Sequence, residues 1–587
     1  MFILKLILTF FFSVFTFFLF QSNSVEVWLM FYFLVFWLNL VSYWNIMYLG
    51  KKGFFIINCL YLGFLSLFTN YIFFLVSNEN LSTYFEFYSI YSIDDNNNVT
   101  LSLYLDFYNF SYINLTLTIG WGAYCYAYSY MRDEVMIERF LFLLLSFLYS
   151  MVFLLMANNF VMLILGWELI GITSYFLINF WVTKISTFKA AFKAFIFNRL
   201  SDVSLIVLLI MYTNFYNTLH LSNDVWLVNH KLFIFYEINN LVINGYDLMA
   251  FFCIIASACK SAQFGFHTWL PDSMEAPVPA SALIHSATLV SAGVYLINKI
   301  WFVVALSNYL YYFFIFLSSW TSFYGAFVSL YQTDLKRILA YSTISHCGIL
   351  MFLSILNNVY ILIFYLYVHG FFKSLSFMCV GNIIKSSFNL QDYRYMGQKY
   401  QTHKFEYFFL LFSLTNLSGY GLSVGFFAKH LIIVNFSFFS FFYFVNFFFF
   451  IMTAVSGFFY SFFLINSVFF SFKKYSTLES ISFSTSYTTT SPMSQVFIIT
   501  FLATQSMILI MYIISFIYCS KFCELKINFI SNFSTSNYLF IQNKYVFIHY
   551  LNFTVWCFFI IFFKFFFFRN FFFLSNYIFI YSFILLF

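Results

Sequence analysis

Isolated ionisable side chains inside apolar sequence are the groups of this chain that could do chemistry. Lys260 lies within the run Cys253–His267, in a chain that is 63% hydrophobic and 8% charged. Three of the four prolines, Pro271, Pro277 and Pro279, follow it closely. A charge at membrane depth is costly and marks a functional site by default. Non-helical backbone at that depth requires burial in protein or contact with a hydrated cavity. The pattern predicts a broken helix beside a polar path through a membrane protein.

Proton transfer is the chemistry that these groups offer. The other candidates in or next to apolar runs are Glu168, His285, Lys336, His369, Lys373 and Lys429. Burial disfavours a charged lysine and a nearby carboxylate favours it, so a lysine between the two effects can exchange a proton when its partner moves. Histidine titrates near neutral pH, and His369 and Lys373 share a helix face at i,i+4. The series predicts a proton relay. For Lys336 the sequence allows both an inward and an interfacial position.

Each of these charges also has a structural interpretation. Glu168 could belong to a fixed ion pair, for which Lys260 is the natural opposite charge, and His285 could be a satisfied core residue. Arg199 and Asp202, at i,i+3, are predicted to pair with each other. The number of charges favours the relay, because each one costs roughly 2.5 to 3.5 kcal/mol at the centre of a membrane helix.

Helical periodicity predicts the neighbours of Lys260. Ser257, Phe264 and His267 lie at three- and four-residue spacings, which place them on the helix face of Lys260. The apolar run that carries Lys260 predicts such a helix over residues 245–266.

Composition predicts an all-α polytopic membrane protein. The mean hydropathy of the 587 residues is +0.87, and continuous apolar runs of about 20 residues are long enough to cross a bilayer as helices. They do not alternate as barrel strands do. About fifteen or sixteen transmembrane helices are expected. The predicted spans are roughly 2–20, 25–49, 54–77, 112–131, 136–157, 158–181, 188–213, 245–266, 279–302, 307–330, 335–356, 358–382, 405–427, 431–470, 494–519 and 546–587.

Other chemistries have no support in the sequence. The net charge of +6 forms no basic patch with interleaved aromatic residues, so no nucleic-acid binding is expected. None of the nine cysteines forms a C-x-x-C motif, which argues against a zinc or iron–sulfur site. The sequence also contains no nucleophile–base set and no P-loop.

Polar stretches divide the chain into predicted parts. The long polar stretches are 78–111, 214–244 and 472–496, and a moderately polar one follows at 520–548. The expected domains are N-terminal transmembrane helices with a polar loop (1–110), a proton-translocating core (111–430), C-terminal transmembrane helices (431–519), and a possible short lateral segment with terminal helices (520–587).

Several motifs resemble one known family. The segment Gly166–Ile178, GWELIGITSYFLI, is similar to the hallmark of NADH–ubiquinone oxidoreductase chain 5, the distal antiporter-like subunit of respiratory complex I. The long segment Lys260–His285 is similar to it in the same way, and Asp334–His346 and His369–Leu375 extend the match. The resemblance covers about residues 110–430.

The resemblance implies an antiporter-like core with two inverted helical repeats, each with a broken helix. It implies that Glu168 and Lys260 form the pair of the first half-channel, and that His285, Lys373 and Lys429 continue the route. Quinone chemistry in a distant partner would drive proton movement across the inner mitochondrial membrane. The chain itself would hold no cofactor; NAD, FMN, iron–sulfur clusters and ubiquinone belong to partner subunits.

The resemblance also implies a setting for the chain. Its expected partners are other membrane-arm subunits, especially the adjacent antiporter-like chain 4, and membrane lipids such as cardiolipin. No Arg-rich transit peptide is evident and the 98 phenylalanines fit an AT-rich genome, so synthesis inside the organelle is expected. The protein would then be a multi-pass inner-membrane protein encoded by the mitochondrial genome.

The sequence departs from the family at three places. Tyr365 stands where the family often has a second histidine one turn before His369, and a tyrosine shuttles protons poorly near neutral pH. His430 replaces the acidic residue that commonly follows the Lys429 position. Residues 520–548 are short for the family's long lateral helix, so that helix is expected to be shortened, rearranged or supplied by another chain.

Two other functions compete with the leading one. A monovalent cation/proton antiporter subunit shares these motifs, although such large chains usually carry a longer C-terminal extension. A structural membrane subunit that has lost pumping is the third; the presence of Glu168, Lys260, Lys373 and Lys429 argues against it.

Overall fold

The computed structural model describes residues 24–471, except 45, 80–81, 95–96, 217–218, 222–234, 239–240, 308, 388, 401, 422 and 435–440. The predictions for residues 1–23 and 472–587 lie outside the described residues. They concern the first span, the polar stretch 472–496, the lateral segment 520–548 and the C-terminal spans.

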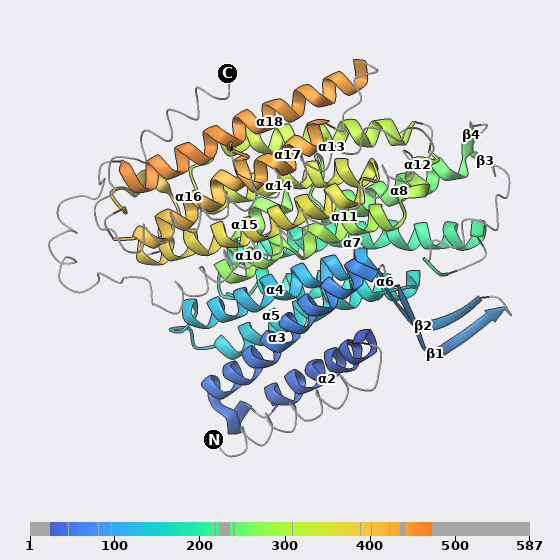
Figure 1. Ribbon diagram of the computed structural model, residues 1–587, viewed down its shortest axis with the longest axis horizontal. Coiled ribbons are helices and arrows are strands. Elements are labelled where there is room, and N and C mark those ends of the chain that lie inside the picture. The colour runs from blue at the N-terminus through green and yellow to red at the C-terminus, as the bar shows by residue number, and fades with distance from the viewer. Residues whose placement is uncertain are drawn as a thin grey trace, which may run out of the picture. The chain divides into compact units, whose positions relative to one another are not determined.

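The described chain is dominated by helices that run alongside one another (Figure 1). The N-terminal helices are α2 (Ser24–Trp44), α3 (Ile46–Glu79), α4 (Phe107–Tyr130), α5 (Ile137–Met156), α6 (Phe160–Ile178) and α7 (Ile185–Tyr216). The central helices are α8 (Gly245–Lys260), α9 (Trp269–Asp272), α10 (Val278–Ser286), α11 (Leu289–Lys299), α12 (Trp301–Ala305) and α13 (Leu310–Ser329). The remaining α-helices are α14 (Leu335–Ile355), α15 (Val359–Ser386), α16 (Lys404–Ser418), α17 (Val424–Val434) and α18 (Phe441–Ile465).

Eight helices in the described part are long and apolar enough to cross a membrane. They are the segments Tyr48–Ser77, Ile137–Met156, Phe160–Ile178, Ile185–Phe215, Val278–Lys299, Leu335–Ile355, Val359–Ser386 and Phe444–Phe470. This confirms the prediction of an all-α polytopic membrane protein.

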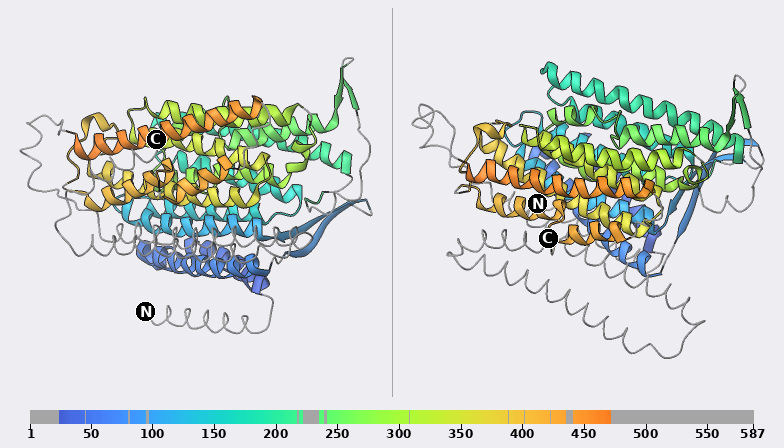
Figure 2. Two further views of the ribbon diagram at one scale, coloured as in Figure 1. Left: turned by 45° about the horizontal axis from the view of Figure 1, so that its top comes forward. Right: turned by 90° about the horizontal axis from the view of Figure 1, so that it is seen from above.

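Neighbouring helices of the chain pack side by side, and two central ones are covered on all sides. Pairs such as α5 with α6, α7 with α8 and α13 with α14 lie in contact. Two further views show the helices running alongside one another (Figure 2). The apolar windows of Val278–Lys299 and Val359–Ser386 are entirely buried. A helix that is apolar all round belongs in the interior of a bundle, and His285, His369 and Lys373 on these two segments are accordingly buried.

Two β-hairpins lie within the predicted polar stretches. Strands β1 (Thr83–Asp94) and β2 (Asn97–Leu105) pair antiparallel, as do β3 (Phe235–Ile238) and β4 (Leu241–Asn244). Figure 1 shows both hairpins at the same end of the helices.

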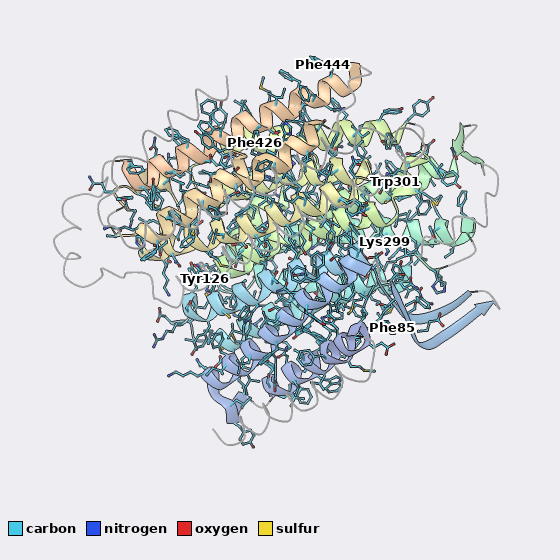
Figure 3. The ribbon with its side chains drawn as sticks, viewed as in Figure 1. Phe85, Tyr126, Lys299, Trp301, Phe426 and Phe444 are labelled. Atoms are coloured by element: carbon cyan, nitrogen blue, oxygen red, sulfur yellow. The ribbon has the colours of Figure 1, made fainter. Side chains whose placement is uncertain are left out.

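The first polar stretch ends earlier than predicted. The sequence extended it to residue 111, but α4 begins at Phe107 because the Asp106 carboxylate accepts a hydrogen bond from the Asn109 amide at 2.7 Å and caps the helix. The Lys299 ammonium lies 3.9 Å from the Asp106 carboxylate and 4.7 Å from the centre of the Tyr104 ring. Figure 3 labels Lys299 among the side chains of the bundle.

The helix that carries Lys260 breaks immediately after that residue. α8 ends at Lys260, Ala262 adopts a left-handed φ of 52°, and the Gln263 amide donates back to the Ala258 carbonyl at 3.0 Å. The prediction of one helix through residue 266 was therefore wrong, and Phe264 and His267 do not continue the helical face of Lys260. The broken helix that the prolines predicted is present, but its break begins before them.

A second break separates α16 from α17. α16 ends at Ser418, and Gly419 follows with a φ of 73°, which favours glycine. The α17 backbone then passes so close to α16 that a Cβ on Gly425 would lie 1.6 Å from the Asn416 carbonyl oxygen. The two interrupted helices confirm the broken-helix part of the fold prediction.

Candidate functional site

Lys260 is buried at the carboxyl end of α8. Its side chain is 1% exposed, its Nζ donates to the Trp167 carbonyl at 3.4 Å, and it lies 5.5 Å from the centre of the Trp167 ring. The position is favourable for a cation because the last carbonyl groups of a helix carry partial negative charge. Among the described residues, no carboxylate oxygen lies within 4.0 Å of this Nζ.

Arg199 on α7 takes the place that the sequence suggested for Lys260. Its guanidinium lies 3.8 Å from the Glu168 carboxylate and 3.3 Å from the Asp202 carboxylate. The predicted Arg199–Asp202 pair is confirmed, whereas Glu168 and Lys260, the pair that the resemblance implies, are not in direct ion-pair contact. Asp202 and Glu168 are the carboxylates of the described residues whose charges act on the Lys260 ammonium. We call Glu168, Arg199, Asp202 and Lys260 the first cluster.

Asp202 was not among the predicted site residues. It is 4% exposed, whereas the Glu168 side chain is 36% exposed to the surroundings of the protein. The i,i+3 spacing to Arg199 was visible in the sequence, but the approach of α8 to α7 was not. Ser201 fixes that approach, since its hydroxyl accepts from the Trp167 indole and donates to the Ala256 carbonyl, both at 2.9 Å.

Lys336 faces inward and binds the connection between the broken helix and α10. Its Nζ donates to the carbonyl oxygens of Met274 at 3.2 Å and Ala276 at 3.1 Å, and the side chain is 4% exposed. Of the two positions that the sequence allowed, the structure therefore shows the inward one. A cation is suited to these carbonyl groups, which a short 3-10 helix (Ser273–Glu275) leaves at its end.

His285 lies on α10 against α15. Its Nε2 is 3.2 Å from the Ser273 hydroxyl, and its ring stacks on Phe377 with ring centres 5.8 Å apart. The imidazole is completely buried, and Nδ1 has no hydrogen-bond partner among the described residues.

His369 and Lys373 lie one turn apart on α15, as predicted. The Lys373 Nζ donates to the Ser342 hydroxyl and to the Leu339 carbonyl, the latter at 3.4 Å, so α14 supplies both acceptors. Both ring nitrogens of His369 are buried without a hydrogen-bond partner among the described residues. We call His285, His369 and Lys373 the second cluster.

His346 on α14 is a buried imidazole that the sequence analysis did not select. Its Nδ1 lies 2.7 Å from the Tyr365 hydroxyl, and its ring centre is 5.5 Å from that of His369. In the sequence, His346 is the last residue of the matching segment Asp334–His346, and no role was predicted for it. Its distance of four residues from Ser342 could have identified it, because that spacing places both on one helix face.

Lys429 lies at the second helix break. Its Nζ donates to the Ser418 carbonyl at 2.8 Å, the last residue of α16. His430 is exposed beside it. The arrangement parallels Lys260, since both lysines contact backbone at an interrupted helix rather than a carboxylate.

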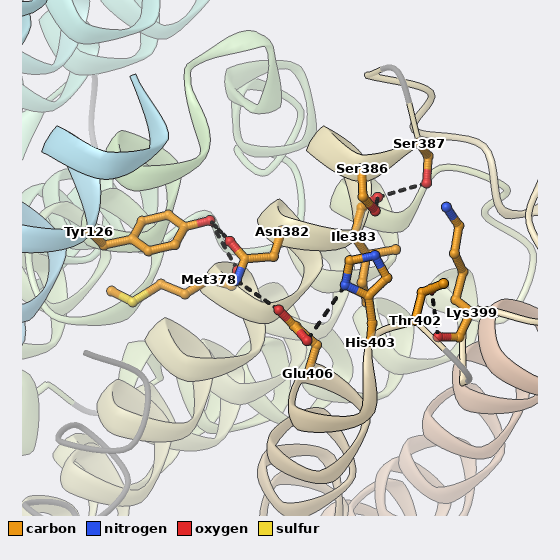
Figure 4. Close-up of polar contacts among 10 residues, drawn as sticks. All are labelled: Tyr126, Met378, Asn382, Ile383, Ser386, Ser387, Lys399, Thr402, His403 and Glu406. Atoms are coloured by element: carbon orange, nitrogen blue, oxygen red, sulfur yellow. Dashed lines mark hydrogen bonds and ion pairs between the residues drawn. The ribbon is translucent and has the colours of Figure 1, made fainter. Parts of the chain in front are cut away.

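A further buried polar chain lies where α4, α15 and α16 meet (Figure 4). The Tyr126 hydroxyl donates to Asn382 at 2.9 Å, Asn382 donates to Glu406 at 3.2 Å, and the Glu406 carboxylate lies 3.6 Å from His403. The sequence analysis missed this chain because its members come from three distant segments.

The arrangement can move protons but shows no metal centre. Within the described ranges, no group of three or more His, Cys, Asp or Glu side chains could hold a metal ion. Lysine and histidine side chains that are buried, and that contact hydroxyl or carbonyl groups, are instead typical of proton relays in transporters.

Comparison with known proteins places this helical bundle in one class. The model of the family "NADH:quinone oxidoreductase/Mrp antiporter, TM" matches residues 157–456, which include both clusters and Lys429. The chain therefore belongs to the NADH:quinone oxidoreductase/Mrp antiporter family, and within it to the relatives of NADH–ubiquinone oxidoreductase chain 5.

Two of these relatives show the extent of the match. The chain is 44% identical over 402 residues to the NADH-ubiquinone oxidoreductase chain 5 of Paramecium tetraurelia, covering 66% of this chain and 67% of that one. It is 36% identical over 316 residues to the chain of the same name from Marchantia polymorpha, covering 53% of this chain and 47% of that one. The resemblance predicted from the motifs is confirmed.

The fold also matches a solved structure. A chain in the structure of the Mrp complex from Dietzia sp. DQ12-45-1b superposes with a TM-score of 0.68 and 22% identity. The match covers 81% of this chain and 49% of that one. It establishes the antiporter-like fold.

Proposed function

We propose that this chain is a proton-translocating membrane subunit of respiratory complex I, which couples NADH oxidation and ubiquinone reduction to proton pumping. The observation that carries the proposal is Lys373. It is completely buried on a covered helix, it contacts a hydroxyl and a carbonyl, and two other ionisable side chains from the same predicted series lie around it. A lysine that only stabilised the fold would be expected to have a buried carboxylate partner.

In this mechanism the first cluster receives the signal. A change in the field along the membrane arm shifts the Arg199 guanidinium between Glu168 and Asp202. When Arg199 moves away from one of these two carboxylates, that carboxylate is left free to interact with the Lys260 ammonium. The affinity of Lys260 for its proton then changes. Lys260 can release that proton, whereas Arg199 stays charged throughout and acts as the movable counter-charge.

The second cluster carries the proton onward. α11 packs against both α8 and α14, so it joins the two clusters mechanically. Lys336 holds the connection before α10 and sets the position of His285. Lys373 and His369 then accept and release protons in turn, and Lys429 at the second break is the next basic group of the series.

The proposal assigns the redox chemistry to other subunits. NAD, FMN, iron–sulfur clusters and ubiquinone would be bound by partners, and this chain would contribute the translocase activity of NADH:ubiquinone reductase. The antiporter-like chain 4 is the proposed neighbour, with cardiolipin among the surrounding lipids. The proposed location is the inner mitochondrial membrane, with the chain encoded by the mitochondrial genome.

A monovalent cation/proton antiporter subunit is the second candidate, favoured by the structural match to the Mrp complex. Purification of the native assembly in mild detergent separates the two. Co-migration with an NADH-oxidising complex, and NADH-driven acidification in liposomes without added sodium or potassium, supports the respiratory function. Migration in a smaller assembly whose proton flux depends on sodium or potassium would replace it with the antiporter.

A further inference from the structure

We propose that His346 is a proton-relay residue, and that Tyr365 positions it beside His369. This inference rests on the proposed function and adds a residue to its second cluster. It also gives a role to Tyr365, which stands where the family often has the second histidine of this relay.

The facing sides of α14 and α15 carry matched polar stripes. On α14, Ser342 and His346 are four residues apart; on α15, Tyr365, His369 and Lys373 follow at the same spacing. Each stripe therefore lies on one helix face. The contacts join them in register: Lys373 to Ser342 at one level, and His346 to Tyr365 and His369 one turn further along.

The contact with Tyr365 fixes the imidazole of His346. The Nδ1–hydroxyl distance of 2.7 Å is that of a good hydrogen bond, and it restricts rotation of the ring. Both side chains are buried, His346 at 5% and Tyr365 at 1% exposure. The ring of His346 is then held 5.5 Å, centre to centre, from that of His369. His346 thus places an imidazole of α14 directly beside the tyrosine of α15.

His369 supplies an independent sign that protons pass here. Both of its nitrogens are buried without a hydrogen-bond partner among the described residues. Buried polar atoms in proteins are nearly always satisfied, so such a pair requires an explanation, and a bridging water is the usual one. A water between His369 and its neighbours would connect the two imidazoles and Lys373.

The charged and titratable groups around His346 and its partner Tyr365 come from four helices. His369 and Lys373 on α15 and Lys429 on α17 act on His346, while Cys347 on α14 and Tyr460 on α18 act on Tyr365. None of these groups is a carboxylate. A protonated His346 would therefore have no local counter-ion, which suits a group that holds a proton only in passing.

The transfer conserves protons and charge at each step. The Lys373 ammonium gives one proton to a neutral His369 through water and becomes a neutral amine. The His369 imidazolium then gives a proton to neutral His346 and returns to the neutral form. His346 releases the proton onward, and Lys373 is reprotonated from the side of the first cluster.

Relocation of the imidazole tests this inference. The variant His346→Gln keeps an amide that can bond Tyr365 but cannot carry a proton. The double variant His346→Gln/Tyr365→His restores an imidazole on α15, where the family often has one. The matched control is His220→Gln, the same change at a histidine outside both clusters, which lies beside Asn158 and Asn159 before the start of α6. Each is measured in the assembled complex in liposomes, as the rate of NADH-driven proton movement and as protons moved per NADH oxidised, with Lys373→Met as reference.

We expect His346→Gln to lower proton transfer about 100-fold, the lower end of the range for a positioned acid–base group. The double variant should recover most of it, and His220→Gln should match the wild type. Normal pumping in His346→Gln, with pumping lost in Lys373→Met, overturns the role of His346 alone. Loss of pumping in both the single and the double variant, with normal assembly, also overturns it, because a relay imidazole should be replaceable. Normal pumping in Lys373→Met overturns the proposed function instead.

Discussion

The two clusters surround their buried lysines with different chemical groups. Around Lys260, the first cluster provides Arg199 with carboxylates at 3.3 and 3.8 Å. Around Lys373 of the second cluster, α14 provides a hydroxyl and a carbonyl and His369 an imidazole, and no carboxylate of the described residues lies within ion-pair distance. Ion pairs respond to a field by exchanging partners, whereas neutral groups pass a proton without holding it. The comparison suggests that the first cluster senses and the second conducts.

The largest expected effect is at Lys260. Lys260→Met should abolish coupled pumping, with a loss of about 100-fold or more in proton transfer. Without Lys260, a rearrangement of the ion pairs in the first cluster has no ammonium group from which to release a proton. The measurement is proton uptake by liposomes that contain the assembled complex, driven by NADH. Unchanged pumping per NADH would show that the first cluster is structural.

The carboxylates of the first cluster should differ in importance. Asp202→Asn should lower turnover more than Glu168→Gln, because Asp202 is buried and interacts more strongly with Lys260. We expect about tenfold for Asp202, from a change in interaction of roughly 1.4 kcal/mol, and less for Glu168. Steady-state NADH:quinone turnover in membranes checks the order. The reverse order would make the direct Glu168–Lys260 pair the functional one.

Packing at the second helix break gives a smaller effect, on stability and assembly. Gly425→Ala should destabilise the assembled protein by about 1 to 3 kcal/mol, the usual range for overpacking, since the added Cβ would meet the Asn416 carbonyl. Gly421→Ala is the matched control, because its Cβ would meet nothing within 4 Å. Thermal inactivation of the detergent-solubilised complex should separate the two variants. Equal stability would show that α17 can move away from α16.

The smallest effect concerns the surface. Hydrogen bonds from the Arg394 guanidinium hold the pKa of the Asp392 carboxyl below its usual value of 3.8. A depressed carboxyl pKa contributes stability that is present above the unfolded value and is lost as the pH falls through the folded one. The contribution of the Asp392–Arg394 pair to the stability of the folded protein should therefore be constant between pH 5 and 8. Asp392→Asn should leave the thermal inactivation curve unchanged over that range, and a pH-dependent difference there would contradict this assignment.

The sequence predicted elements and chemistry better than it predicted pairings. Apolar runs and the prolines predicted helices and a break, because hydropathy and backbone restriction act locally. Glu168 and Lys260 are not in direct contact because Arg199 on α7 binds the Glu168 carboxylate, an arrangement that depends on how three helices pack. His346 and Asp202 were missed for the same reason: their neighbours lie on other helices.

The break after Lys260 shows the limit of periodicity. Three- and four-residue spacing would place Phe264 and His267 on the face of Lys260, but only if the helix continues. The left-handed residue Ala262 ends that continuity, and an alanine gives no signal of a turn, since glycine or asparagine would normally occupy such a position.

The most direct test of proton conduction by the second cluster is the variant Lys373→Arg. Arginine keeps the positive charge but does not release its proton at any working pH. The measurement is the number of protons moved per NADH oxidised by the assembled complex in liposomes. If Lys373 carries protons, the ratio should fall as far as in Lys373→Met. If Lys373→Arg pumps like the wild type while Lys373→Met does not, Lys373 is a fixed charge and the relay does not pass through it.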